Sequence, residues 1–163
     1  MGKIVVVGSI NMDICYRVAH IPVPGETIIA SDVIKSPGGK GANQAVAAAK
    51  LGANVAMIGC IGNDGDGDTL YHSLADVGVD LTMLKRCADA QTGTAFINVS
   101  DDGENNIVVH PGANACVNTE LLEKAEKWIA RAQILIAQLE IPHETVWKAI
   151  RHARELGVYT VLN

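Results

Sequence analysis

Two polar side chains that follow an apolar strand are the first residues in this 163-residue sequence whose placement suggests chemistry. Residues 3–8 form a Val-rich run typical of a parallel strand buried on both faces, and Asn11 and Asp13 come just after it. Ligands of open α/β sheets bind beyond the carboxyl ends of the strands, where an amide and a carboxylate can grip vicinal hydroxyl groups. The same two residues could instead form only an Asx-type turn.

A glycine-rich loop favours the ligand-binding interpretation. The run Gly38-Gly39-Lys40-Gly41-Ala42-Asn43 leads into an Ala-rich segment, residues 42–51, whose composition predicts a helix that stops at Gly52. Glycines let a polar ligand approach the backbone, and free N–H groups at a helix start favour negative charge or hydroxyl oxygens. We therefore interpret this run as a binding loop rather than a bare turn.

The loop matches neither of two common nucleotide-binding motifs. A Walker P-loop places Ser or Thr after its lysine to hold magnesium, but Gly41 follows Lys40 here and no glycine lies at the required spacing upstream. The run Gly8-Ser9-Ile10 does not continue as the Rossmann Gly-x-Gly-x-x-Gly. The loop is therefore a binding element of another kind.

Glu140 is a further candidate at a strand end. It follows a buried strand predicted over residues 134–139, so it should lie at the same sheet edge as Asp13. Because Glu140 also precedes Pro142, at the expected start of a helix, its carboxylate could serve only to favour the positive end of the helix dipole. Both roles are open from the sequence alone.

Acidic and thiol side chains offer no convincing metal site. Asp64, Asp66 and Asp68 resemble the start of an EF-hand loop, but Thr69 and Ala75 stand where that loop needs its Gly and its bidentate Glu. The cysteines are widely separated, form no Cys-x-x-Cys pair and have no histidine at ligand spacing. We predict no metal ligand set in this chain, and reduced thiols at Cys15, Cys60, Cys87 and Cys116.

Alternating strand and helix signals predict a doubly wound, mostly parallel sheet flanked by helices. Further strands are expected over residues 54–61, 81–86 and 159–162, and helices over 67–77, 118–129 and 142–157. On the last helix the predicted core face carries Val146, Trp147, Ile150 and Ala153.

Four half-exposed strands are predicted to form a small β lid beside the main sheet. Two of them, residues 14–19 and 27–34, flank a turn that contains Pro22, Pro24 and Gly25. The other two, residues 92–99 and 106–110, form a hairpin. The lid segments thus span residues 14–34 and 92–110.

Composition excludes several classes of protein. Nearly half of the residues are apolar (48%) and only 19% are charged, which is typical of a folded chain. A net charge of −5 without a basic run argues against a nucleic-acid partner. The longest charge-free apolar stretch, residues 51–62, is shorter than the roughly 20 residues of a membrane span. With no signal-peptide pattern at the start, we expect a cytoplasmic location and no membrane contact.

The glycine-rich loop and its surroundings resemble the ribokinase (PfkB) family of carbohydrate kinases. The run Gly38 to Ala45, followed by Gly52 and Gly62 at the right intervals, is similar to the first signature of that family. Further similar pieces follow in order along the whole chain: Gly8 to Asp13, Pro24 to Thr27, the Gly62-x-Asp64-x-x-Gly67 turn, and Gln138 to Glu140.

The resemblance implies a sugar site and an activity. Carried over position by position, it implies that the sugar hydroxyls are hydrogen-bonded by Asn11, Asp13, Gly39, Lys40, Asn43 and Glu140. It implies ATP-dependent phosphorylation of ribose or a similar furanose at its primary hydroxyl, with magnesium and a possible monovalent cation. It also implies a homodimer formed through the lid strands. A nucleoside or other sugar kinase, and a non-catalytic sugar-binding or dimerisation module, are the alternatives.

The catalytic machinery of the family is not expected within these 163 residues. A Gly-Ala-Gly-Asp motif in the second half of the family provides the anion hole and the aspartate base, and this sequence contains no such motif. The expectation is that residues 1–163 are the N-terminal sugar-binding portion of a ribokinase-like fold. The C-terminal, nucleotide-binding part of the fold and the aspartate base would lie beyond Asn163. Alone, the chain is expected to be inactive.

Overall fold

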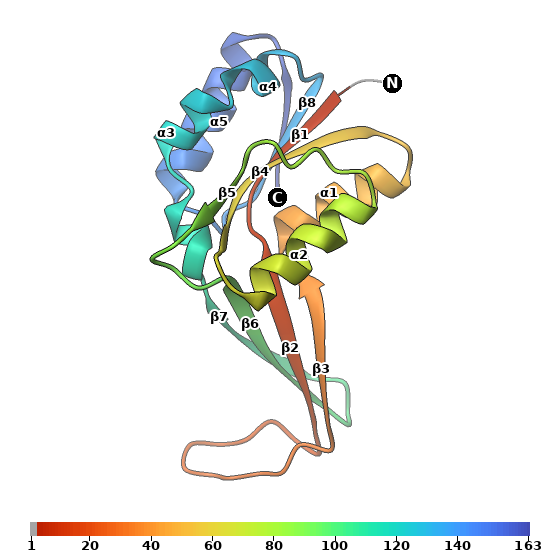
Figure 1. Ribbon diagram of the computed structural model, residues 1–163. Helices are drawn as coiled ribbons and strands as arrows, with labels where there is room; N and C mark the ends of the chain where they lie inside the picture. Colours follow the sequence, from red (N-terminus) through yellow and green to blue (C-terminus); the bar gives the residue numbers. More distant parts are fainter. Residues whose placement is uncertain (1–2) are drawn as a thin grey trace.

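A parallel five-stranded sheet forms the centre of the computed structural model, which describes residues 3–163 (Figure 1). Its strand order is β5-β4-β1-β8-β9, and every neighbouring pair is parallel. The strands are β1 (Lys3–Val7), β4 (Asn54–Gly62), β5 (Leu84–Cys87), β8 (Ile134–Ala137) and β9 (Tyr159–Leu162). The doubly wound parallel sheet predicted from the sequence is confirmed.

Helices cover both faces of this sheet, which we call the body sheet. One face packs against α1 (Lys40–Lys50) and α2 (Gly65–Asp76), and the other against α3 (Thr119–Lys124), α4 (Glu126–Ala130) and α5 (His143–Glu155). Because side chains alternate along a strand, Val6 joins the first core and Val5 and Val7 join the second. Within residues 3–163, no helix combines the length and the apolar character that crossing a membrane requires.

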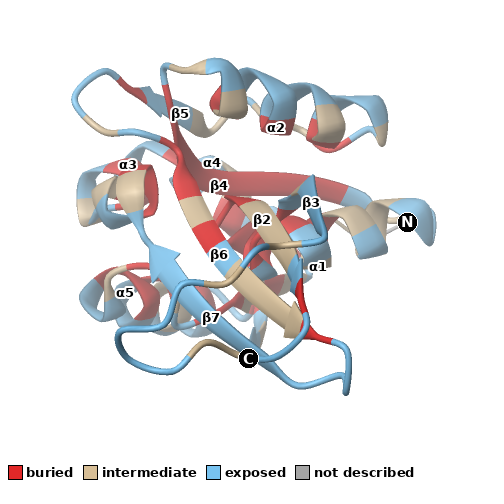
Figure 2. Cartoon of the chain, turned by 90° about the horizontal axis from the view of Figure 1, so that it is seen from below, coloured by how far each residue is buried: buried red, intermediate tan, exposed pale blue. Residues whose placement is uncertain are grey.

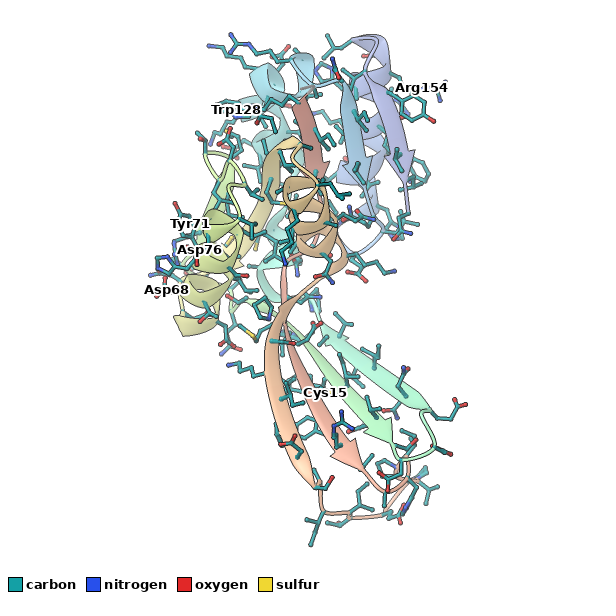
Figure 3. All side chains as sticks on the ribbon, turned by 90° about the vertical axis from the view of Figure 1, so that its right-hand side faces the viewer. Cys15, Asp68, Tyr71, Asp76, Trp128 and Arg154 are labelled. Carbon is teal, nitrogen blue, oxygen red and sulfur yellow. The ribbon has the colours of Figure 1, made fainter. Side chains whose placement is uncertain are left out.

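The other four strands form a separate sheet, the lid sheet, which projects away from the body (Figures 1 and 3). Its order is β3-β2-β6-β7, with antiparallel outer pairs and a parallel central pair. The strands are β2 (Asn11–Val18), β3 (Asp32–Gly38), β6 (Gly93–Ser100) and β7 (Asn105–His110). The predicted four-stranded lid is therefore present. In Figure 3 the label Cys15, on β2, marks the middle of this sheet.

The first pair of lid strands is displaced from its predicted position. The register pairs Asn11 with Gly38 and Arg17 with Asp32, so both strands extend closer to the body than residues 14–34 suggested. Residues 19–31 form a loop at the far end, where Glu26 accepts hydrogen bonds from the Val23 N–H and pairs with His20. In this loop the Val23 N–H bonds to a side chain, so it is not available to pair with a neighbouring strand. Asn11 and Asp13, at the other end of β2, lie on an extended strand and not in an Asx turn.

Two helix predictions were wrong in detail. The helix expected over residues 118–129 is interrupted at Ala125, whose N–H is shared between the carbonyls of Leu121 and Leu122, although Asn118 caps α3 as predicted. On α5, Trp147 is 51% exposed and not part of the core face. It lies about 100° around the helix from Val146, away from the stripe that meets the sheet. That stripe consists of Thr145, Val146, Ala149 and Ala153.

Candidate functional site

Four segments meet at the carboxyl edge of the body sheet, next to the root of the lid. Strands β1 and β8 are parallel neighbours, with Val7 paired to Ala137, so the residues that follow them lie side by side. Ser9 follows β1, and Glu140 follows β8. The N-terminus of α1 and the start of β2 complete the cluster.

The glycine-rich loop seats helix α1 directly on the connection between β1 and β2. Gly39 has φ 89°, and a Cβ there would lie 2.7 Å from the Asn11 backbone nitrogen. A Cβ at position 41 would lie 2.7 Å from the Ser9 backbone nitrogen. The Ala42 N–H instead reaches the Ser9 carbonyl oxygen at 2.9 Å. Any side chain at these two positions would force the helix start away from the strand ends.

Glu140 is bound to this helix start. Its Oε2 accepts a hydrogen bond from the Ser9 hydroxyl at 2.7 Å and one from the Lys40 N–H at 3.4 Å. Its Oε1 lies 3.5 Å from the Lys40 ammonium, and the two side chains are 27% and 58% exposed. Helix α5 has Pro142 as its N-cap and no side-chain hydrogen bond there. Glu140 therefore makes no capping hydrogen bond to α5, and its hydrogen bonds are made at the start of α1.

Asp13 places a second carboxylate near the first. Its side chain lies over the backbone of Gly38, although Asp13 pairs with Ser36 in the β2–β3 ladder and Gly38 pairs with Asn11. Partial burial, and then the negative charge of Glu140, raise the pKa of Asp13. Ionised Asp13 is thus held in unfavourable surroundings that a hydrogen-bond donor from a ligand would relieve.

Asn11 and Asn43 relate differently to this cluster. Asn11 is 3% exposed, and its Oδ1 accepts a hydrogen bond at 2.7 Å from Asn114. Asn43 is exposed in the first turn of α1, where its backbone N–H donates to the Gly39 carbonyl at 2.9 Å. Its side chain has no hydrogen bond to the other candidates within the part of the chain that the structure describes. The structure thus brings Asp13, Gly39, Lys40 and Glu140 together, with Asn11 beside them and Asn43 at the rim.

Two residues of the cluster were missed by sequence reasoning. Ser9 is fully buried, donates to Glu140, and its Oγ lies 3.4 Å from the Gly41 N–H. It stands inside the Gly8 to Asp13 run, so that run was the signal that could have identified it. Asn114, 103 residues from its partner Asn11, gave no local signal at all.

The three aspartates considered for calcium bind different partners. Asp64 caps α2 through the Gly67 N–H at 2.8 Å and accepts hydrogen bonds from the Thr92 hydroxyl at 2.6 Å and the Thr92 N–H at 2.8 Å. Burial alone would raise the pKa of Asp64, but these hydrogen bonds outweigh it and lower the pKa. Asp64 therefore ties α2 to the segment that enters the lid. Asp66 pairs with Lys35, and Asp68 with Arg86.

Comparison with known proteins identifies relatives of this arrangement. The model of the pfkB family carbohydrate kinases matches residues 1–163. The ribokinase of Haemophilus influenzae is 43% identical over 158 residues, covering 97% of this chain and 52% of that protein. The chain spans about half the length of the curated relatives it matches.

Solved structures agree with the sequence relatives. The ribokinase of Thermotoga maritima superimposes with a TM-score of 0.88 at 39% identity, over 99% of this chain and 52% of that one. The Arabidopsis thaliana ribokinase, solved in complex with ribose and ATP, gives a TM-score of 0.84 at 33% identity, over 99% of this chain and 53% of that one. The chain therefore belongs to the pfkB family of carbohydrate kinases.

Proposed function

We propose that this chain supplies the sugar-recognising half of a kinase that transfers the γ-phosphate of ATP to the primary hydroxyl of ribose or a similar furanose. The observation that carries the proposal is the convergence of two carboxylates and one ammonium group, from Asp13, Glu140 and Lys40, at the carboxyl edge of the body sheet. Paired acceptors and donors of this kind suit neighbouring hydroxyl groups, each of which donates one hydrogen bond and accepts others.

Each predicted site residue has a role in this proposal. Asp13 and Glu140 accept hydrogen bonds from sugar hydroxyls, and these donors offset the repulsion between the two carboxylates. Lys40, which pairs with Glu140, and Asn43 lie in the first turn of α1 and orient the sugar from there. Asn11 donates from the start of β2, and Gly39 allows the backbone to approach the ligand.

ATP, magnesium and a monovalent cation belong to the proposal for the longer enzyme. The Arabidopsis relative was solved with ribose and ATP, which supports ATP as the donor. Among residues 3–163, no three His, Cys, Asp or Glu side chains are grouped to hold a metal ion, so the residues present do not fit a magnesium site. Bound magnesium would supply charge neutralisation at the phosphates.

The 163-residue chain alone is proposed to lack kinase activity. Phosphoryl transfer depends on groups that position the phosphates and on a base for the attacking hydroxyl, and the cluster described above contains only acceptor-binding groups. Incubation of the purified chain with ATP and ribose should therefore give no ribose-dependent ADP release. Such release above the no-enzyme background would overturn this part of the proposal.

Sugar recognition is tested by calorimetry with ribose on the chain and on two matched variants. Glu140→Gln removes one charged acceptor of the cluster, and we expect ribose affinity to fall by about tenfold or more. Glu144→Gln, in the exposed first turn of α5, keeps the same chemical change but should leave affinity unchanged. Equal affinities of the wild type and Glu140→Gln would remove this carboxylate from the site.

The identity of the sugar and the rival functions need a second experiment. A coupled kinase assay on an enzyme that contains this chain and a nucleotide-binding half should compare ribose, deoxyribose, fructose and adenosine. Preference for adenosine would favour a nucleoside kinase. Ribose binding without turnover in that longer protein would favour a non-catalytic sugar-binding module.

We also propose that the lid sheet forms a homodimer through one of its faces. By the strand register, Phe96 and its partner Val108 share a face with Val33, and these side chains are 40%, 66% and 54% exposed. Side chains alternate between faces, so Asp13 lies on the other face, toward the candidate site. The face carrying Phe96 is therefore left for a second copy of the chain.

Sedimentation equilibrium tests the dimer. Val108→Glu places a charge on the proposed dimer face and should yield monomers at micromolar concentration. Ile107→Glu makes the same change on the opposite face, where the residue is 53% exposed, and should leave the dimer intact. A wild-type chain that is monomeric at tens of micromolar would contradict the proposal.

A further inference from the structure

Asn114 is a buried amide whose orientation is set by the backbone. It lies in the 3₁₀ turn Gly112–Cys116 after β7 and is 1% exposed. Its Oδ1 accepts a hydrogen bond from the Ile10 N–H at 2.9 Å, and its Nδ2 donates to the Ile10 carbonyl at 3.1 Å. Since a backbone N–H can only donate and a carbonyl can only accept, the positions of oxygen and nitrogen in this side chain are unambiguous.

The second N–H of Asn114 determines how Asn11 is oriented. Nδ2 of Asn114 lies 2.7 Å from the side chain of Asn11, and a donor there must meet an acceptor. The atom of Asn11 on this side is therefore its Oδ1, and the Asn11 amide nitrogen points the other way. A reversed Asn11 amide would set two donors against each other in a buried place.

The amide nitrogen of Asn11 is open to a ligand. It has no hydrogen-bond partner among residues 3–163, yet it is not sealed from solvent. Over the same residues, Gln138 Oε1 is the one fully buried side-chain polar atom without a partner. Asn11 is 3% exposed as a whole, so only a small opening reaches it, and it lies two positions before Asp13 on strand β2.

We propose that Asn114 is a positioning residue of the sugar site, which fixes the Asn11 amide so that its N–H donors face the sugar. This inference rests on the proposed function. The lid strand β6 supports the arrangement, because Gly93 leaves the space where a Cβ would collide with both the Asn114 and the Asn11 side chains. The result is a donor from Asn11 set beside the acceptor from Asp13 on one strand.

A double-mutant cycle with ribose calorimetry on the chain tests the inference. Asn11→Ala and Asn114→Ala should each weaken ribose binding by about tenfold. The first removes the donor that faces the sugar, and the second removes the contact that orients this donor. The double variant should bind no more weakly than Asn11→Ala alone, since Asn114 then has no amide to position. If Asn114→Ala weakens ribose binding by the same factor in the wild type and in Asn11→Ala, the two losses are additive. That result would overturn the proposal and leave Asn114 a merely structural residue.

Two further variants keep the test decisive. Asn114→Asp retains the size and the acceptor for the Ile10 N–H but loses both donors, so it replaces Asn114→Ala if the latter does not fold, with the same expected coupling. Asn118→Ala removes a side-chain hydrogen bond to the Leu121 N–H at 3.0 Å in α3, and should lower the melting temperature without changing ribose affinity. A loss of affinity in Asn118→Ala would attribute the Asn114 effect to stability and contradict the proposal.

A spectroscopic arm separates this inference from the proposed function. In the free chain, both side-chain amide protons of Asn114 should be protected from exchange and show contacts to the Gly93 α-protons. In Asn11→Ala, one of the two protons should lose protection. Fast exchange of both protons in the wild type would overturn the positioning role. A wild-type chain with this protection but no ribose binding would overturn the sugar function instead.

Discussion

A central strand of the body sheet and an outer strand of the lid sheet differ in how far their apolar side chains are buried. In the body, every residue of β4 after Asn54 is buried, whereas in the lid all six residues of β7 are exposed (Figure 2). The body sheet has helices on both faces, and the lid sheet has none along most of its length. Body strands can therefore be continuous apolar runs, while the lid retains exposed apolar residues that only a ligand or a partner would cover.

The difference shows where each sheet obtains its stability. The body depends on two hydrophobic cores, so its strands are specified by packing. The lid depends on its ladders and on how it is attached to the body. That attachment is polar and close-packed, through Asn114, Asp64 and the Gly39 turn. The candidate sugar site lies at this boundary, with residues from both sheets.

The largest expected effect comes from truncating a buried side chain of the body sheet, compared with truncating an exposed side chain of the lid sheet. Leu135→Ala, at a fully buried position of β8, should lower the free energy of unfolding by about 2–5 kcal/mol, because it removes packed apolar atoms and leaves a cavity. Ile107→Ala, at a 53% exposed position of β7 on the face opposite the proposed dimer face, should change it by less than about 0.5 kcal/mol. Urea denaturation measures both values. Similar losses would show that this face of the lid is covered in solution.

A second prediction concerns Asp13, at the boundary between the two sheets, where a carboxylate proposed to bind the sugar lowers the stability of the fold. Asp13→Asn should weaken ribose binding by roughly ten- to a hundredfold, through loss of a charged hydrogen bond. Because the folded state raises the pKa of Asp13, its ionised form disfavours folding once the pH exceeds the ordinary value of 3.8. The variant should therefore be more stable than the wild type at neutral pH, and this gain should vanish below pH 3.8.

Calorimetry and thermal melts over a pH series measure both consequences. Ribose affinity of the wild type should fall as the pH drops through the raised pKa of Asp13, while the variant should be insensitive in that range. A pH-independent wild-type affinity, or a variant that is less stable at neutral pH, would contradict the account of the two carboxylates.

Asp64→Ala tests the attachment of the lid with a smaller effect. The change removes the cap of α2 and the two hydrogen bonds to Thr92, and should cost about 1–2 kcal/mol of unfolding free energy. Hydrogen exchange should accelerate at Thr92 and at the start of β6, while the core of β4 stays protected. Asp66→Ala, which loses only the pair with Lys35, serves as the control and should cost less than about 0.5 kcal/mol. Uniform acceleration throughout both sheets would show that the lid does not open separately.

The smallest predicted effect compares two carboxylates by acid titration. Burial opposes the ionisation of Asp80, but hydrogen bonds from Thr82 and Trp128 and the charge of Lys3 lower its pKa to about 2. Its stabilisation is therefore full above pH 3.8 and is lost as the pH falls toward 2. Asp80→Asn should cost on the order of 1 kcal/mol at pH 7, allowing for solvent screening, and flatten the acid limb of the stability curve.

Asp102, at the tip of the lid, is the natural comparison for Asp80. Hydrogen bonds from the Ser100 hydroxyl and the Glu104 N–H lower its pKa, but it is fully exposed. Asp102→Asn should therefore change thermal stability less than Asp80→Asn at every pH. The opposite order would mean that the lid tip at Asp102 is covered in solution and would contradict this comparison.

Much of the body could be predicted from the sequence because its signals are local. The Val-rich run before Gly8, the Ala-rich helix after Gly39 and the cap at Asn118 each lie within a few residues of the element they specify. Trp147 was wrongly assigned to the core face of its helix because it is only one sequence position away from Val146, which does belong to that face. The lid register was misplaced because Pro22 and Pro24 mark a turn but not the pairs that flank it.

By itself, the sequence determined the order of strands and helices, the glycine-rich helix start and most of the residues proposed to meet a sugar. The folded arrangement was needed to show that Glu140 binds Ser9 and Lys40 instead of capping α5, and that the pKa of Asp13 is raised beside it. It also decided that Asn114 orients Asn11. The reason is physical: propensity and periodicity act over short windows. The contacts of Glu140 and Asn114 join residues 100 or more positions apart, which only packing brings within hydrogen-bond distance.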